Sequence, residues 1–189
     1  MATRQDFELA FQLLIGHEAG FTNNPDDNGN WTGGRKGVGE LKGTKYGISA
    51  HAYPHLDIRH IDLSTAHNLY ESDYWLKSGC DQLSPRTAYI VFDAAVNMGV
   101  SRAVTFLQQA VGTAVDGRFG PNTRAAVQAA VARDESHLLV EFHAHRLRFM
   151  TGLNTWPTFR GGWSRRLVSV AIEAADYWPS PTAGNRTGA

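Results

Sequence analysis

The sequence contains little that could stabilise it covalently, and it has no excess of charge of either sign. Its single cysteine, Cys80, has no second cysteine with which to form an intramolecular disulfide. The 18 Lys and Arg residues balance the 18 Asp and Glu residues, so the formal net charge is zero. This balance gives no general attraction to nucleic acid or to an anionic membrane. We therefore expect neither a nucleic-acid partner nor a stable membrane association.

The sequence also lacks long apolar runs. A membrane-spanning helix needs roughly 20 predominantly apolar residues, and no uninterrupted stretch approaches that length. Near the N-terminus, Asp6, Glu8 and His17 interrupt the apolar residues, and no small-residue cleavage site follows an apolar core. We expect synthesis in the cytoplasm without a signal peptide, so that action outside the cytoplasm depends on release by another protein.

Apolar residues at helical spacing are present over most of the chain. The pattern at residues 7–15 predicts a first helix that ends near Glu18. The Gly-, Asn- and Asp-rich stretch that follows, residues 21–45, predicts a loop or short hairpin, and residues 44–49 predict a short strand or turn. Helical spacing returns at 64–79, at 84–112 with a break near Gly99, from 121 onward, at 135–153 and at 162–178. The predicted fold class is mainly α, a helical bundle with a small irregular β element near the N-terminus.

The length and composition set the domain organisation that we expect. With 189 residues, of which 42% are hydrophobic, the chain can form one domain with a sizeable core. No internal repeat divides it. We predict a single monomeric globule over residues 1–178, with an N-terminal segment at 1–83 and a helical segment at 84–178. The tail at 179–189 is polar and contains Pro and Gly, and we predict that it is disordered.

Two kinds of carboxylate lie close together in the N-terminal segment. Glu18 ends an apolar helical run, whereas Asp26 and Asp27 lie in a polar loop. Cleavage of a glycosidic bond needs one protonated carboxyl group and one ionised carboxylate. Partial burial favours the protonated form and a wet, polar environment favours the ionised form. This spacing suits that chemistry, but by itself it is more typical of a helix end followed by a turn.

The residues around these carboxylates are more specific. The stretch HEAGF at 17–21, an Asp nine residues after Glu18, and TKYGIS at 44–49 together resemble the opening segment of glycoside hydrolase family 108. That family comprises N-acetylmuramidases, many of them phage endolysins. Here Ala19 replaces the first Gly of the family pattern. The chain also takes seventeen positions from Asp27 to Thr44, a much longer gap than is usual in the family, so residues 28–43 form an inserted loop.

Glu18, Asp27 and Thr44 also resemble the catalytic set of phage-type lysozymes, which implies a role for each residue and a lysozyme-like fold. Glu18 would be the general acid, Asp27 would orient or activate the attacking water, and Thr44 would help to hold that water. A hydroxyl beside a carboxylate can place a water on the sugar face opposite the acid, which gives inversion. Asp26 is an alternative to Asp27, and Glu40 in the inserted loop is a further, less apolar candidate.

Three residues are candidates for substrate contact. Trp31 lies in the inserted loop and Tyr46 in the TKYGIS motif, and aromatic rings stack on sugar faces. Asn97 is a polar residue in an otherwise apolar helix, where it could line a cleft. Each has a simpler interpretation: Trp31 as the apolar anchor of a solvated loop, Tyr46 as a core aromatic, and Asn97 as a core polar group with its hydrogen bonds satisfied.

The downstream half carries a second resemblance. FLQQAVGTAVDGRFGPNT at 106–123 is similar to the peptidoglycan-binding segment that usually follows the family 108 segment. The Gly residues of 116–123 permit a tight loop, and Pro121 suits a first helical turn. The alternative is that this loop only joins two helices. By the two resemblances, residues 1–83 are the catalytic segment and 84–178 the peptidoglycan-binding segment.

No cofactor or metal is indicated. His137, Glu141, His143 and His145 cluster on one helical stretch, but they do not form the HExxH pattern of zinc proteases. We interpret these histidines as surface residues of an amphipathic helix. Cys80 has no partner suited to nucleophilic catalysis, and we interpret it as a packed thiol.

The combined prediction is an endolysin-type N-acetylmuramidase that hydrolyses the β-1,4 bond between N-acetylmuramic acid and N-acetylglucosamine in bacterial peptidoglycan. It would act on the cell wall after holin-dependent release, in a phage or a prophage. Three alternatives remain open: a lytic transglycosylase, a chitinase of lysozyme-like fold, and a non-catalytic cell-wall binding protein.

Overall fold

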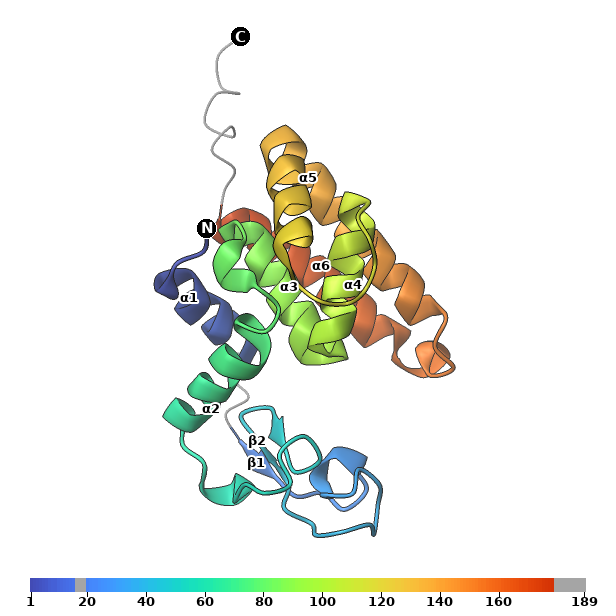
Figure 1. The fold of residues 1–189 in the computed structure, drawn as a ribbon. Coiled ribbons are helices and arrows are strands. Elements are labelled where there is room, and N and C mark those ends of the chain that lie inside the picture. Colours follow the sequence, from blue (N-terminus) through green and yellow to red (C-terminus); the bar gives the residue numbers. More distant parts are fainter. Residues whose placement is uncertain (16–19, 179–189) are drawn as a thin grey trace. The chain divides into compact units, whose positions relative to one another are not determined.

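The computed structural model describes residues 1–15 and 20–178, which form two compact units (Figure 1). We call residues 8–71 the loop-rich unit, and residues 1–7 together with the chain from residue 72 onward the helical unit. The predicted organisation of residues 1–178 as one globule stays a prediction. The tail predicted to be disordered, 179–189, lies outside the described residues.

The first helix, α1 (Arg4–Ile15), contributes to both units. It begins with a capping box, in which the amide and hydroxyl of Thr3 both donate to Asp6 Oδ2 at 2.7 Å. Phe7 then packs in the helical unit, with its ring 5.8 Å from that of Phe92. Phe11, one turn further on, packs in the loop-rich unit, with its ring 5.5 Å from that of Tyr70. The apolar spacing in the sequence therefore predicts the buried face of this helix correctly.

A small antiparallel sheet organises the loop-rich unit. Its strands lie in the order β1 (Phe21–Thr22), β2 (Thr44–Lys45) and β3 (Ile48–Ser49). Thr44 pairs with Thr22 on one side and with Ser49 on the other. Tyr46 and Gly47 form the two-residue turn between β2 and β3, and both have positive φ, 51° and 74°. Such a turn matches the right-handed twist of paired strands. It therefore sets the register in which β2 pairs with β3. The unit also contains η1 (Asn28–Asn30), η2 (Ile58–His60) and α2 (Leu63–Tyr70).

The inserted loop folds back on itself as an irregular hairpin. Trp31 and Leu41 form an antiparallel bridge, and the Thr32 amide donates to the Glu40 carbonyl at 2.9 Å. The Thr32 hydroxyl accepts from the Glu40 amide at 2.9 Å. Gly39 has a φ of 78°, and a Cβ there would lie 2.2 Å from Thr32 Oγ1. Glycine is therefore required at this position for the two arms of the loop to meet.

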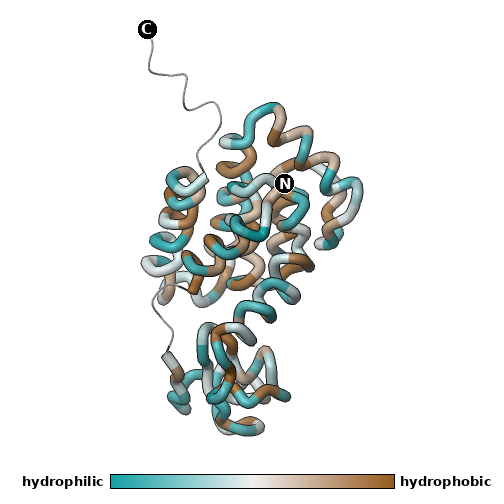
Figure 2. Tube along the Cα trace, turned by 90° about the vertical axis from the view of Figure 1, so that its left-hand side faces the viewer, coloured by the Kyte–Doolittle hydropathy of each residue, from teal (hydrophilic) through white to brown (hydrophobic). Residues whose placement is uncertain are grey.

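Helix α3 (Pro85–Met98) is the centre of the helical unit. From Ala88 to Ala95 all of its residues are buried, and Phe92 packs against Trp75 with a ring separation of 5.4 Å. Figure 2 shows apolar and polar residues interleaved along the helices of this unit, as expected for amphipathic helices around a shared core. The elements are η3 (Glu71–Trp75), a π-helical turn that continues from the loop-rich unit, η4 (Cys80–Gln82), α3 (Pro85–Met98), α4 (Val100–Val111), α5 (Pro121–Thr151) and α6 (Trp156–Tyr177).

The long helix α5 is interrupted at Asp134, whose backbone is not helical (φ −166°, ψ 96°). Asp134 Oδ1 accepts from the His137 amide at 3.0 Å and so caps the part that follows. This matches the two helices predicted from 121 and at 135–153. The predicted mainly α fold class with a small β element near the N-terminus is confirmed. Within the described residues, no helix is long and apolar enough to cross a membrane.

Candidate functional site

Asp27 is held in place by the turn that it begins. It is the N-cap of η1, and its Oδ1 accepts from the Gly29 amide at 2.9 Å. The side chain is exposed. In the described part of the chain, its second carboxylate oxygen, Oδ2, has no hydrogen-bond partner. Asp27 therefore presents one anchored oxygen and one oxygen that can accept a proton or bind a water.

Asp26 is in a different situation. Its carboxylate lies 2.5 Å from Lys36 Nζ, in an ion pair whose side chains are 72% and 64% exposed, respectively. Exposed pairs of this kind contribute little to stability, but the contact occupies Asp26 Oδ1. The structure therefore distinguishes two carboxylates that are neighbours in the sequence, since Asp26 binds an arm of the inserted loop and Asp27 caps a helical turn.

Thr44 is bound to a buried asparagine that sequence reasoning missed. The Thr44 hydroxyl donates to Asn30 Oδ1 at 2.7 Å, and Asn30 Nδ2 donates to the Asn24 carbonyl at 3.0 Å. Asn30 has no exposed surface. Its amide group is therefore fixed at both ends, and it fixes the rotamer of Thr44 in turn.

The backbone of Asn30 connects the same parts of the unit. Its amide donates to the Asp27 carbonyl at 3.1 Å, and its carbonyl accepts from the amides of Lys42 and Gly43 at 3.0 and 3.1 Å. Asn30 thus joins the turn of Asp27 to the strand of Thr44. No periodic pattern marks Asn30 in the sequence, because its burial depends on loop hydrogen bonds rather than on a helix or strand face.

The two predicted aromatic contacts both lie in the loop-rich unit. Trp31 is half-buried, and its indole donates to the Pro25 carbonyl at 2.9 Å. Tyr46 lies in the β2–β3 turn, is half-buried, and has Lys45 Nζ 5.3 Å from the centre of its ring. Both rings keep part of their surface accessible to a ligand. The predicted acid, Glu18, lies outside the described residues.

Asn97 belongs to the helical unit, and the structure does not support the core interpretation of it. The residue is exposed near the end of α3, where Nδ2 donates to the Asp93 carbonyl at 2.7 Å and lies 3.3 Å from Asp93 Oδ1. Asp93 itself is buried between two arginines, Arg146 at 2.6 Å and Arg166 at 2.6 Å. Asn97 therefore lies at the edge of a buried ion-pair cluster, where it lines a cavity of about 310 Å³.

The interpretation of His143 as a surface residue was wrong. His143 is buried, and neither ring nitrogen has a hydrogen-bond partner in the described part of the chain. Burial, together with the charge of Arg146, lowers its pKa to about 4, although Asp93 opposes this effect. The imidazole is therefore neutral at physiological pH. Its burial is consistent with its position between Leu139 and Met150, which are buried on the same helix.

Cys80 is a packed thiol, as predicted. It is fully buried, its Sγ donates to the Ala88 carbonyl at 3.4 Å, and burial raises its pKa to about 12. Such a thiol is protonated and inert. Within the described residues, no group of three or more His, Cys, Asp or Glu side chains is placed to hold a metal ion.

The loop at 116–123 is organised by one buried side chain, Gln108 of α4. Its Nε2 donates to Asp116 Oδ1, to the Arg118 carbonyl and to Thr123 Oγ1, at 2.7, 3.1 and 3.0 Å. Its Oε1 accepts from the amides of Asp116 and Gly117. The hydrogen bond from Gln108 holds the pKa of Asp116 below its usual value. These contacts favour the structural interpretation, in which this loop joins α4 to α5.

The comparisons with known proteins agree with the two sequence resemblances. Residues 11–99 match the family described as glycosyl hydrolase 108, and residues 102–168 match the family described as predicted peptidoglycan domain. The chain is similar to the solved structure of SagA from Brucella abortus, with a TM-score of 0.79 and 26% sequence identity over 95% of this chain and 99% of that chain. No curated protein sequence matches it.

Proposed function

Because residues 11–99 belong to the glycosyl hydrolase 108 family and residues 102–168 to the predicted peptidoglycan domain, we propose that the chain is an N-acetylmuramidase. It is a glycoside hydrolase that acts on peptidoglycan in the cell wall. We propose that the bond cleaved is the β-1,4 link between N-acetylmuramic acid and N-acetylglucosamine, and we assign the residues that cleave it.

The proposed reaction uses two carboxyl groups in opposite states. Glu18 gives its proton to the glycosidic oxygen as the bond to the anomeric carbon breaks. Asp27 accepts a proton from a water that attacks this carbon from the opposite face, and the configuration is inverted. The products are a new reducing end on muramic acid and a free 4-hydroxyl on the leaving sugar. Glu18 is left ionised and Asp27 protonated, and exchange with solvent restores both.

The arrangement around Asp27 and Thr44 is the observation that carries this mechanism. The Thr44 hydroxyl already donates its proton to Asn30 Oδ1, so it meets a water as an acceptor. Asp27 Oδ2 is an acceptor as well. A water that donates one hydrogen to each oxygen would direct a lone pair at the sugar, which is the orientation that nucleophilic attack requires.

The structure also supports Asp27 over Asp26 as the base. A catalytic carboxylate needs a fixed orientation and a free oxygen. Asp27 has both, because the Gly29 amide anchors one of its oxygens. Asp26 is held by Lys36 in an exposed ion pair. We further propose that Trp31 and Tyr46 stack on sugar rings and that Asn97 contacts the substrate from the helical unit.

The first experiment measures reducing sugar released from purified peptidoglycan by the wild type and by three variants. Glu18→Gln and Asp27→Asn should each lower the rate by about a hundredfold or more, the usual contribution of a general acid or base. Asp26→Asn is the matched control and should retain most of the activity. Unimpaired Glu18→Gln, or greater loss in Asp26→Asn than in Asp27→Asn, would contradict these assignments.

The biological setting is a further part of the proposal. We propose an endolysin that works as a monomer and leaves the cytoplasm with the help of a holin. The test is expression of the chain alone and together with a holin, followed by measurement of the protein outside the inner membrane. Passage without the holin would overturn this part and leave the chemical proposal intact.

A further inference from the structure

Two neighbouring cavities in the helical unit share part of their lining. They have volumes of about 550 and 310 Å³, and both are lined by Met98, Arg102 and Phe149. The helices α3, α4, α5 and α6 all contribute side chains to them. We call this site the arginine groove and define it by Asn97, Arg102, Arg148, Phe149, Trp163 and Arg166.

The groove carries positive charge that the described protein does not neutralise. Among residues 1–15 and 20–178, no acidic side chain lines either cavity. Arg146 and Arg166 share the single carboxylate of Asp93. Arg102 and Arg148 have no carboxylate within 4.0 Å among the described residues. An anionic group entering the groove would therefore meet guanidinium groups without displacing an existing partner.

Two of these guanidinium groups, those of Arg102 and Arg146, are also held in position. Arg102 stacks on the ring of Phe149, with its guanidinium carbon 3.9 Å from the ring centre, and a stacked arginine loses little freedom when it binds. Arg148 lies 3.5 Å from the ring nitrogen Nδ1 of His145. Arg146 lines the smaller cavity and is 2% exposed, and its Nε is buried with no partner in the described part of the chain. A buried donor without an acceptor marks a place where a ligand oxygen gains a hydrogen bond.

Aromatic residues lie beside the cations. Phe149 and Trp163 line the smaller cavity, and Trp163 continues into a row of rings on α6, 5.6 Å from Phe159 and 6.2 Å from Trp156. Phe159 is 50% exposed. The groove thus combines fixed cations with exposed apolar rings, which suits a ligand that alternates carboxylates with short aliphatic groups.

We propose that the arginine groove binds the carboxylates of peptidoglycan stem peptides, with Arg102 and Arg148 as the residues that contact them. A stem peptide carries carboxylates along a chain of small aliphatic residues, which matches the lining of the groove. This inference rests on the proposed function for its choice of polymer. According to this proposal, the helical unit binds the peptide stems of peptidoglycan rather than its glycan strands. Phosphate shares the same oxyanion chemistry, and the test separates the two.

The test is an NMR titration of the full-length chain with a synthetic stem tripeptide, L-Ala-γ-D-Glu-meso-diaminopimelate, following arginine Nε–H and tryptophan indole signals. The tripeptide has no glycosidic bond, so binding is measured independently of hydrolysis. Two parallel titrations use the same tripeptide with its carboxylates amidated and glycerol phosphate. Only the free-acid tripeptide should bind. Arg102→Ala and Arg148→Ala should each weaken binding about tenfold, as expected for the loss of one charged hydrogen-bonding pair.

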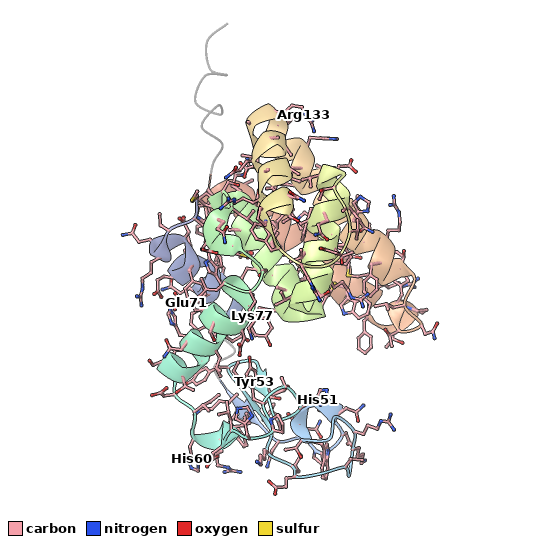
Figure 3. The ribbon with its side chains drawn as sticks, viewed as in Figure 1. His51, Tyr53, His60, Glu71, Lys77 and Arg133 are labelled. Atoms are coloured by element: carbon pink, nitrogen blue, oxygen red, sulfur yellow. The ribbon has the colours of Figure 1, made fainter. Side chains whose placement is uncertain are left out.

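Two control variants distinguish specific binding in the arginine groove from non-specific electrostatic attraction of the tripeptide. Arg133→Ala makes the same charge change at an exposed arginine that lines neither cavity and directly precedes the break at Asp134 in α5 (Figure 3), and it should bind like the wild type. Arg102→Lys keeps the charge but loses the planar group, and it should fall between wild type and Arg102→Ala. No binding of the free-acid tripeptide, equal or tighter binding of glycerol phosphate, or an equal effect of Arg133→Ala would overturn the proposal.

Hydrolysis of whole peptidoglycan by the same variants distinguishes this proposal from the proposed function. Arg102→Ala should raise KM while kcat stays near the wild-type value, because the contact is made equally in the ground state and the transition state. If the wild type releases no reducing ends, the muramidase proposal fails and the tripeptide titration still decides the groove. If hydrolysis is normal and the titration is negative, only the groove proposal fails.

Discussion

At the scale of single residues, the candidate site depends on Asn30, a side chain that takes no direct part in the proposed reaction. Asn30 fixes the Thr44 hydroxyl through Oδ1 and the Asn24 carbonyl through Nδ2. Asp27, which the sequence motif favours over Asp26, is joined to Asn30 by a backbone hydrogen bond. Motif and chemistry predicted Asp27 and Thr44 as a pair, because carboxylates and hydroxyls have recognisable roles. They could not predict Asn30, since nothing in a loop sequence says which amide is buried.

We predict that Asn30→Ala lowers kcat and destabilises the loop-rich unit by about 1–3 kcal/mol, because the part-buried hydrogen bonds to the Thr44 hydroxyl and the Asn24 carbonyl are lost. Asn30→Asp keeps the acceptor for Thr44 and should recover part of kcat at unchanged KM. The measurements are the rate of reducing-end release and chemical denaturation. If Asn30→Ala keeps full kcat despite lower stability, Asn30 has a structural role only.

At the scale of elements, periodicity predicted helices well and the loop poorly. The two parts of α5 were predicted separately, and the break falls at Asp134. Residues 21–45 were predicted as a loop or short hairpin, and the inserted loop does fold as an irregular hairpin. Its register was not predicted, because it depends on backbone hydrogen bonds such as Thr32 to Glu40. His143 shows the reverse case. Leu139, His143 and Met150 share one face of α5 by helical spacing, so its burial could have been predicted from the pattern.

The inserted loop offers a matched pair of glycine substitutions. Gly37 and Gly43 both have positive φ, 78° and 84°, but a Cβ at Gly43 would lie 2.4 Å from the Thr22 carbonyl oxygen, whereas a Cβ at Gly37 has nothing within 4 Å. Backbone strain is therefore similar in the two Ala variants. We expect Gly43→Ala to disturb the β1–β2 pairing and to lower hydrolysis more than Gly37→Ala does. Equal activity and equal melting temperatures in the two variants would refute this difference.

At the scale of the whole molecule, one buried histidine should couple stability to pH. The pKa of His143 in the folded protein is about 4, below the usual histidine value of 6.5. Between these values the unfolded chain binds more protons, so stability is complete above about pH 6.5 and falls as the pH drops toward 4. The loss is about 3 kcal/mol, from the size of the shift.

Chemical denaturation at several pH values tests this coupling. Over the range from pH 6.5 to 4, the wild type should lose stability steadily. His143→Gln, which cannot titrate, should show a flatter profile whatever its absolute stability. Asp116 has a pKa below its usual value of 3.8, so the stability that it contributes is lost mainly below this window. A His143→Gln profile as steep as that of the wild type would show that another group is responsible.

Product analysis tests the central claim, that the chain hydrolyses peptidoglycan at muramic acid with Glu18 as the acid. Peptidoglycan is digested in heavy-oxygen water by wild type and by Glu18→Gln, and the soluble fragments are analysed by mass spectrometry. The wild type should release reducing N-acetylmuramic acid ends that carry one heavy oxygen, and Glu18→Gln should release almost none. Anhydro-muramic ends without heavy oxygen, reducing ends on N-acetylglucosamine, or full activity in Glu18→Gln would contradict it.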